Sequence, residues 1–284
     1  MLRSDPFRPR KLVVSLAATL LLSGCGLFGH EKPPIDLSTQ QPDVLYNHGI
    51  DSIHDKSYSQ AITQFEAIQQ FYPYSPYTAN AQLMEGYAYY KRDEFPDAIS
   101  QLDRFLQLHP TSPDAAYAYY LRALCYYEQI ADIQRDQQGT VQAMAALQEV
   151  VARFPNTDYA RDAALKIDLC RDHLAGKEML IGRYYERQHF YEAAVNRYQR
   201  VVQDYQTTNH VAEALQRLVE VYLKLGLVDQ ARKTASVLAY NYPGSIWYSY
   251  AYDQLRRTHS LQPGDQMPAP AKGGLISRTW NSVF

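Results

Sequence analysis

The stretch Tyr58-Ser59-Gln60-Ala61-Ile62-Thr63-Gln64-Phe65-Glu66-Ala67-Ile68-Gln69-Gln70-Phe71-Tyr72-Pro73 contains the unit on which this chain is built. Four and seven residues after Ala61 come Phe65 and Ile68, which is the spacing of one apolar face of a helix. Pro73 follows the alanine by twelve residues. We expect the helix to end there, because proline has no amide hydrogen to donate.

The same pattern recurs four more times along the chain. The further alanines are followed four and seven residues later by these pairs: Ala98 by Leu102 and Phe105, Ala143 by Leu147 and Val150, Ala194 by Tyr198 and Val201, and Ala231 by Ala235 and Leu238. Pro110, Pro155 and Pro243 keep the twelve-residue offset, whereas Gln206 stands in that place in the copy that begins at Ala194. Four prolines in register argue against a chance match in an alanine-rich protein.

A second element precedes each alanine. It consists of a residue that is usually small, followed in most copies by a tyrosine three positions later: Gly49, then Gly86 and Tyr89, Ala123 and Tyr126, Gly182 and Tyr185, and Val219 and Tyr222. Small residue, tyrosine, alanine and proline form the pattern of the tetratricopeptide repeat, a helix-turn-helix unit of about thirty-four residues. The sequence therefore predicts an all-α fold, a right-handed α-α superhelix of five tetratricopeptide repeats plus a C-terminal capping helix.

The organisation of the array follows from composition and spacing. We expect the repeats and capping helix to span residues 42–259, with an insertion at 130–139, and residues 159–177 to lengthen or duplicate a helix. The capping helix is predicted from Trp247, Tyr250, Ala251 and Leu255, and would cover the otherwise exposed end of the last repeat. Residues 260–284, in which Pro, Gly and polar residues predominate, are predicted to form a mobile tail.

The amino terminus resembles that of a bacterial lipoprotein. Basic residues precede the apolar run Leu12–Leu22, which is too short to span a membrane and is typical of a signal peptide. Leu22-Ser23-Gly24-Cys25 resembles a lipobox, so we expect a signal peptide over 1–24, lipidation of Cys25 and a lipidated tether over 25–41. The alternative is an ordinary signal peptide with an incidental cysteine. Because Gly26 stands where an aspartate would resemble an inner-membrane retention signal, the outer membrane is favoured.

The sequence contains no motif of an enzyme or of a cofactor site. It lacks a glycine-rich phosphate loop, His-Glu-x-x-His and Gly-x-Ser-x-Gly. His48, Asp51, His54 and Asp55 could approach one another on a helix, but a solvated polar face is favoured over a metal site. We therefore expect no catalytic residue, no metal and no cofactor. Cys125 and Cys170 are expected to be buried thiols, with a disulfide as the less favoured alternative.

Charge and aromatic content indicate the kind of partner. A net charge of -2 leaves no electrostatic footprint for nucleic acid, while 25 tyrosines suit the binding of extended peptides. In tetratricopeptide arrays the first helix of each pair lines the inner surface, and the repeats place mostly polar residues there in the fourth and fifth copies, among them Glu186 and Gln216. The predicted peptide-binding set is Tyr46, Ile50, Tyr72, Leu83, Tyr87, Tyr90, Tyr117, Tyr120 and Tyr127. The alternative is that these rings fill space between neighbouring helices.

Several motifs resemble the BamD family, the lipoproteins of the outer-membrane β-barrel assembly machinery. The resemblance covers about residues 42–245 and rests on Ser59–Ala67, Tyr72–Tyr77, Ala88–Lys91, Asp103–Phe105, Tyr184–Arg187 and Ala194–Arg197. It implies a non-enzymatic outer-membrane subunit that faces the periplasm, binds the barrel protein BamA and other lipoproteins of the machinery, and recognises unfolded outer-membrane proteins.

The same resemblance implies a role for one basic side chain. In the family, the position of Arg197 pairs with an acidic residue of a periplasmic domain of BamA, whereas the local pattern alone indicates a solvated helix arginine. Two other functions remain open for a lipoprotein with such repeats. They are an adaptor for peptidoglycan enzymes and a pilotin for a pilus secretin.

Overall fold

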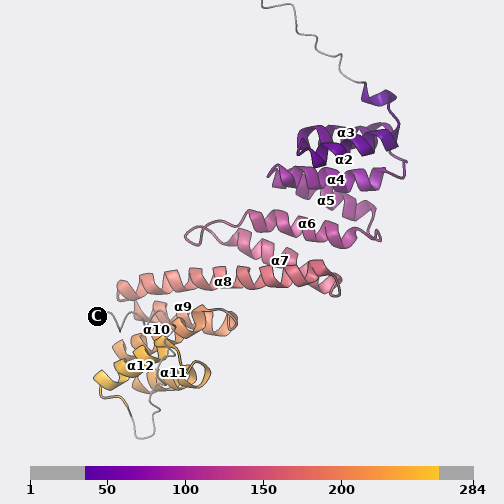
Figure 1. The fold of residues 1–284 in the computed structure, drawn as a ribbon. Coiled ribbons are helices and arrows are strands. Elements are labelled where there is room, and N and C mark those ends of the chain that lie inside the picture. The colour runs from indigo at the N-terminus through magenta and orange to yellow at the C-terminus, as the bar shows by residue number, and fades with distance from the viewer. Residues whose placement is uncertain (1–35, 262–284) are drawn as a thin grey trace, which may run out of the picture. The chain divides into compact units, whose positions relative to one another are not determined.

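The computed structural model describes residues 36–261 and is shown in Figure 1. The predicted signal peptide, Cys25 and the tail beyond Leu261 lie outside the described residues. The chain divides between Gln41 and Pro42 into two units. In the first unit the described residues include one turn of 3-10 helix, η1 (Leu37–Thr39), and the carboxylate of Asp36 caps it by accepting a hydrogen bond of 3.0 Å from the backbone N–H of Ser38.

The second unit is built from helices joined by short turns, and the described residues contain no strand. The helices are α2 (Pro42–His54), α3 (Tyr58–Phe71), α4 (Thr78–Lys91), α5 (Phe95–Leu108), α6 (Ala115–Glu128), α7 (Gln138–Arg153), α8 (Asp158–Arg187), α9 (Tyr191–Asp204), α10 (His210–Lys224), α11 (Val228–Asn241) and α12 (Ile246–Arg257). Each helix packs against its neighbours in chain order, and α12 packs on α10 and α11 (Figure 1). The prediction of five helix pairs and a final helix is confirmed.

The predicted apolar positions form the core. All five repeat alanines are fully buried, and so are the residues seven positions after them. The residues four positions after them are at most 5% exposed. Removing this apolar surface from water is the main stabilising contribution to such an array, at about 25 cal/mol per Å². The alanine periodicity read from the sequence therefore marks the face along which the two helices of each pair meet.

The small residue of each first helix makes room for the large side chain of the second. A Cβ on Gly49 would lie 2.4 Å from the Phe65 ring, and a Cβ on Gly182 would lie 2.4 Å from the Tyr198 ring. The fifth repeat reverses the sizes, with Val219 in the place of the glycine and Ala235 in the place of the ring, and both are buried. Each pair thus keeps its closely packed contact, but with different side chains.

The turns within and between the pairs also repeat. Within four of the pairs, one residue adopts a left-handed conformation, with φ between 59° and 75°: Lys56, Asp93, His189 and Gly226. The second helices end on a residue of similar backbone conformation, from φ -132° and ψ 53° at Tyr72 to φ -127° and ψ 42° at Tyr205. Tyr205 has this conformation although Gln206, and not a proline, follows it. The second helix of the fourth copy therefore ends as the others do without the proline.

Helix α8 accounts for the extra residues before the fourth repeat. Residues 159–177 lengthen one continuous helix of 30 residues, as the sequence allowed. The insertion in the third repeat folds onto this helix, since Lys177 Nζ donates to the backbone carbonyls of Gln134 and Arg135 at 2.9 and 3.0 Å. Ile133 fills the space beside Gly176, since a Cβ added to Gly176 would lie 2.6 Å from Ile133 Cδ1. The insertion is therefore an ordered part of the array.

The capping helix α12 buries Ala251 and Leu255 as the spacing suggested and packs Trp247 against the core, but Tyr248 takes the buried place predicted for Tyr250. Tyr248, Ala251 and Leu255 are buried in the core of the last two repeats, whereas Tyr250 is 48% exposed. Among residues 36–261, none of the helices combines the length and the apolar character that a membrane span requires.

One carboxylate lies in the core of the first two repeats. Glu85 on α4 is fully buried, one of its oxygens accepts a hydrogen bond from Gln69 Nε2, and the other has no hydrogen-bond partner. Burial raises its pKa to about 7, the Gln69 hydrogen bond lowers it, and Glu66 and Arg104 nearby act in opposite directions. At neutral pH the packing of α3 against α4 is therefore coupled to a titrating group.

We expect Gly182→Ala to lower the free energy of unfolding, because the added methyl would overlap the buried Tyr198 ring at a cost of about 1–3 kcal/mol. The gain in helix propensity from alanine, about 1 kcal/mol, offsets part of this cost. Gly244→Ala is the matched control, since its Cβ would meet no atom within 4 Å. Thermal unfolding followed by circular dichroism measures both, and equal melting temperatures for the two variants would contradict the packing argument.

We expect Glu85→Gln to stabilise the protein increasingly as the pH rises. A carboxyl whose folded-state pKa is about 7 and whose reference value is 4.5 stabilises the fold below the lower value and loses that contribution as the pH passes the higher one. The free energy of unfolding of the variant, relative to that of the parent, should therefore be up to about 3 kcal/mol higher at pH 8 than at pH 4.5. Urea unfolding at several pH values tests this, with the exposed Glu192→Gln as control. A difference in free energy of unfolding between variant and parent that stays the same at every pH would refute this prediction.

Candidate protein-binding site

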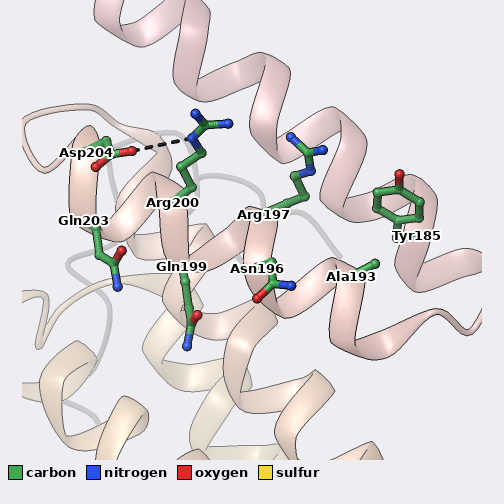
Figure 2. A pocket seen from close by; sticks show the side chains of 8 residues that line it. All are labelled: Tyr185, Ala193, Asn196, Arg197, Gln199, Arg200, Gln203 and Asp204. Carbon is green, nitrogen blue, oxygen red and sulfur yellow. Dashed lines mark ion pairs between the residues drawn. The ribbon is translucent and has the colours of Figure 1, made fainter.

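A surface pocket of about 530 Å³ lies along helix α9 and contains the arginine singled out from the sequence. Its lining includes Arg197 and Arg200, together with Tyr185 from α8. Figure 2 shows the two arginines extending toward the same side of α9, while Asn196, Gln199 and Gln203 extend toward the other. Apart from Tyr185, all lining residues come from one helix, so their arrangement follows from helical geometry.

A buried carboxylate on α8 holds the two arginines. Glu178 is 9% exposed, and its two oxygens accept hydrogen bonds of 3.1 Å from Arg197 Nη1 and Arg200 Nη1. Arg200 Nε lies 3.6 Å from Asp204 as well (Figure 2). The pairing keeps Glu178 from being a buried charge without compensation, which would cost several kcal/mol. We call Arg197, Arg200 and Glu178 the arginine clamp.

The arginine clamp leaves hydrogen-bond donors for a partner. The Arg197 side chain is 34% exposed and that of Arg200 is 54% exposed. A guanidinium has five N–H donors, and Arg197 uses one of them within the described residues. An arginine whose position is set by an internal carboxylate can bind a second carboxylate with little further ordering. The exposed N–H groups of the two guanidinium groups therefore suit acidic groups.

The polar positions predicted for the inner face of the last two repeats are buried or hydrogen-bonded to neighbouring helices. Glu186 is buried and accepts hydrogen bonds from Tyr198 Oη at 2.9 Å and Lys224 Nζ at 3.0 Å. Lys224 also donates to Glu220 at 2.9 Å, and Gln216 is buried. These residues join α8, α9 and α10 by charge-assisted hydrogen bonds, so they are a structural network rather than a free polar surface.

Four of the predicted tyrosines lie near one another: Tyr87, Tyr90, Tyr117 and Tyr120. The rings of Tyr117 and Tyr120 lie 5.6 and 5.3 Å from that of Tyr159 on α8. Burial raises the pKa of Tyr117, and the neighbouring hydroxyls of Tyr87, Tyr159 and Tyr90 raise it further. All of these rings are partly buried against the core clusters, so they fill space between helices and still present an aromatic surface.

The other predicted peptide-binding residues are placed differently. Leu83 is 6% exposed and belongs to the core, so its inclusion was wrong; a residue three positions before the small one points into the helix contact here. Tyr72 ends α3, the second helix of its pair, and Tyr46 packs on Phe65 and Tyr77 at 5.9 and 5.4 Å. Ile50 is half-buried on α2, and Tyr127 lies on α6 with Lys166 Nζ 5.1 Å from its ring centroid.

Three residues of these surfaces were missed from the sequence. Arg200 stands three residues after Arg197, but a charged residue on a helix carries no local signal of a site. Glu178 and Tyr159 lie on α8, far from their partners in sequence, and only the packing of helices brings them together. The two cysteines are buried and free, and within residues 36–261 no three His, Cys, Asp or Glu residues are grouped to hold a metal.

The repeats, the arginine clamp and the tyrosines define a tetratricopeptide-repeat protein whose surfaces suit the binding of other polypeptides. The family model described as YfiO, an outer membrane lipoprotein, matches residues 38–238. The chain belongs to this family, whose curated members are named outer membrane protein assembly factor BamD.

The curated relatives resemble this chain over most of its length. It is 42% identical to the BamD of Caulobacter vibrioides over 98% of this chain and 91% of the relative. It is 49% identical to the BamD of Rickettsia prowazekii over 84% and 96%, and 33% identical to that of Neisseria meningitidis over 91% and 97%. Solved repeat structures match weakly; the TPR2AB domain of yeast Sti1 is 13% identical, covers 77% of this chain and 86% of its own, and has a TM-score of 0.41. The repeat assignment therefore rests on the helix pairs.

Proposed function

We propose that this protein is a subunit of the outer-membrane β-barrel assembly machinery, which binds the barrel protein BamA and passes unfolded outer-membrane proteins to it. The observation that carries the proposal is the arginine clamp on α9 in a member of the BamD family. In this proposal the C-terminal repeats dock an acidic segment of BamA on Arg197 and Arg200. Lipid on Cys25 anchors the subunit to the outer membrane with the repeats in the periplasm, where other lipoproteins of the machinery bind.

Substrate capture in this proposal uses the N-terminal repeats. Tyr87, Tyr90, Tyr117 and Tyr120 offer rings that pack on apolar and aromatic side chains, and hydroxyls that bond an extended backbone. Tyrosine has few rotatable bonds, so ordering it on binding costs little entropy. The work of assembly then comes from binding energy, without nucleotide or metal.

The docking site is tested by Arg197→Glu, which should abolish co-purification with BamA from detergent-solubilised envelopes. The new carboxylate would repel the partner's acidic residue, and losing a charge pair of this kind costs about 2–5 kcal/mol.

The same substitution also places two carboxylates side by side inside the subunit, so it needs a control for folding. Arg197→Glu combined with Glu178→Gln removes the internal repulsion and should still fail to bind, while Arg161→Glu on the exposed face of α8 should bind normally. Retention of BamA by the combined variant would show that Arg197 is not the docking residue.

The aromatic surface is tested by Tyr87→Ala with Tyr90→Ala. We expect photocrosslinking to a peptide from the end of an unfolded barrel protein to weaken about tenfold or more, since a buried aromatic contact contributes at least ~1 kcal/mol. Tyr240→Ala is the control, because its side chain is 86% exposed and distant in sequence. Circular dichroism checks that the variants fold, and unchanged crosslinking by a folded double variant would reject this surface.

A further inference from the structure

A second pocket, of about 450 Å³, lies where α6, the insertion that follows it and α8 come together. Its apolar lining includes Tyr127, Ile130 and Leu169. Leu169 is 58% exposed. Tyr127 also belongs to the predicted peptide-binding set and packs, like Tyr120, against the core of the third repeat. We call Tyr87, Tyr90, Tyr117, Tyr120 and Tyr127 the tyrosine row. An exposed leucine in a pocket with aromatic and aliphatic neighbours is a surface that an aliphatic chain would cover.

The polar part of the lining is negatively charged and incompletely compensated. It contains Glu128 and Asp172, with no Lys or Arg. Glu128 forms no ion pair with any residue between 36 and 261, and Asp172 faces there the imidazole of His210, whose Nε2 lies 3.8 Å away and carries charge only when protonated. The other oxygen of Asp172 is buried without a hydrogen-bond partner. A cation entering the pocket would offset this charge.

The third polar residue of the lining also offers an acceptor. His173 Nδ1 lies 2.8 Å from Gln137 Oε1. The amide of Gln137 is oriented by two hydrogen bonds from its Nε2 to the carbonyls of Asp132 and Arg135, both 3.1 Å, so its Oε1 accepts and His173 Nδ1 donates. In a neutral imidazole, Nε2 is then an acceptor. The pocket therefore holds two carboxylates and an imidazole acceptor beside an apolar wall.

Within the chain itself, the Tyr127 ring already contacts one ammonium group. Lys166 Nζ stands 5.1 Å from the centroid of the Tyr127 ring, at the distance of a cation–π contact. Lys166 also pairs with Asp162 at 3.5 Å, which itself accepts a hydrogen bond from Tyr120. A cation with a long aliphatic stem is thus already compatible with the tyrosine row.

From these observations we infer that the pocket receives a lysine or arginine side chain of an extended polypeptide bound along the tyrosine row. The aliphatic stem packs on Tyr127, Ile130 and Leu169, and the cation meets Glu128 and Asp172. The inference rests on the proposed capture of unfolded barrel proteins and specifies the substrate further. Captured segments carry a basic side chain among their apolar and aromatic ones.

The test measures fluorescence anisotropy of the full mature chain with three labelled peptides. All alternate tyrosine and serine and differ in one central residue, which is lysine, norleucine or glutamate. We expect the lysine peptide to bind about tenfold more tightly than the norleucine peptide, the ratio that ~1.4 kcal/mol produces, and the glutamate peptide to bind most weakly. In Glu128→Gln combined with Asp172→Asn, the preference for lysine over norleucine should fall to about twofold or less.

Matched variants separate the pocket from the rest of the surface. Asp168→Asn removes a carboxylate on α8 outside this pocket, and should keep the preference. Leu169→Ser should weaken all three peptides, whereas Leu165→Ser, which removes a leucine that is 67% exposed one turn earlier, should not. Equal binding of the lysine and norleucine peptides, or a preference that survives loss of both carboxylates, would overturn the pocket assignment alone. Failure of every peptide to bind the parent chain would overturn the proposed capture and the pocket together.

Discussion

The close contact between Gly182 and the Tyr198 ring determines how α8 and α9 meet, and the rest of the C-terminal half depends on it. With no Cβ on Gly182, the ring lies directly on the backbone of α8, and its hydroxyl reaches Glu186 one turn further along. Arg197 precedes Tyr198 on α9, and Glu178 precedes Gly182 by one turn on α8. The packing of the Tyr198 ring on Gly182 thus determines the relative position of the residues that form the arginine clamp.

The two halves of the array treat buried carboxylates differently. In the C-terminal half, Glu186 receives hydrogen bonds from a tyrosine and a lysine, and Glu178 receives them from two arginines. In the N-terminal half, Glu85 has one amide donor and an oxygen without a partner. A satisfied network holds its helices in one arrangement, whereas a poorly satisfied carboxyl weakens the packing around it once it ionises. The C-terminal repeats are therefore joined by satisfied charge-assisted hydrogen bonds, whereas the packing of α3 on α4 is coupled to the ionisation of Glu85.

Much of the fold could be predicted because the repeat imposes local rules. Alanine spacing located the helix contacts, and the prolines located the ends of the second helices in every pair but the fourth. Two features could not be predicted, because no characteristic residue marks them. Lys56 and His189 adopt a left-handed conformation in turns where glycine is the usual residue. Tyr205 ends α9 although a glutamine, and not a proline, follows it. The site was less predictable. Periodicity cannot tell a ring that lines a surface from a side chain that faces the neighbouring helix, which is why Leu83 was misplaced. It also carries no information about long-range pairs such as Glu178 with Arg200.

In the docking that we propose, the arginine clamp would bind an acidic segment with little loss of side-chain entropy. A free arginine on a helix samples many rotamers, and ordering it on binding costs about 0.5–1.5 kcal/mol. Here Glu178 has already ordered both side chains, since each guanidinium gives it one hydrogen bond and keeps other donors exposed. The internal carboxylate also neutralises part of the positive charge, so a diffuse anion gains less than a carboxylate that fits the remaining N–H groups. Selectivity in the proposed docking would then come from the geometry of those donors, which the packing of α8 on α9 determines.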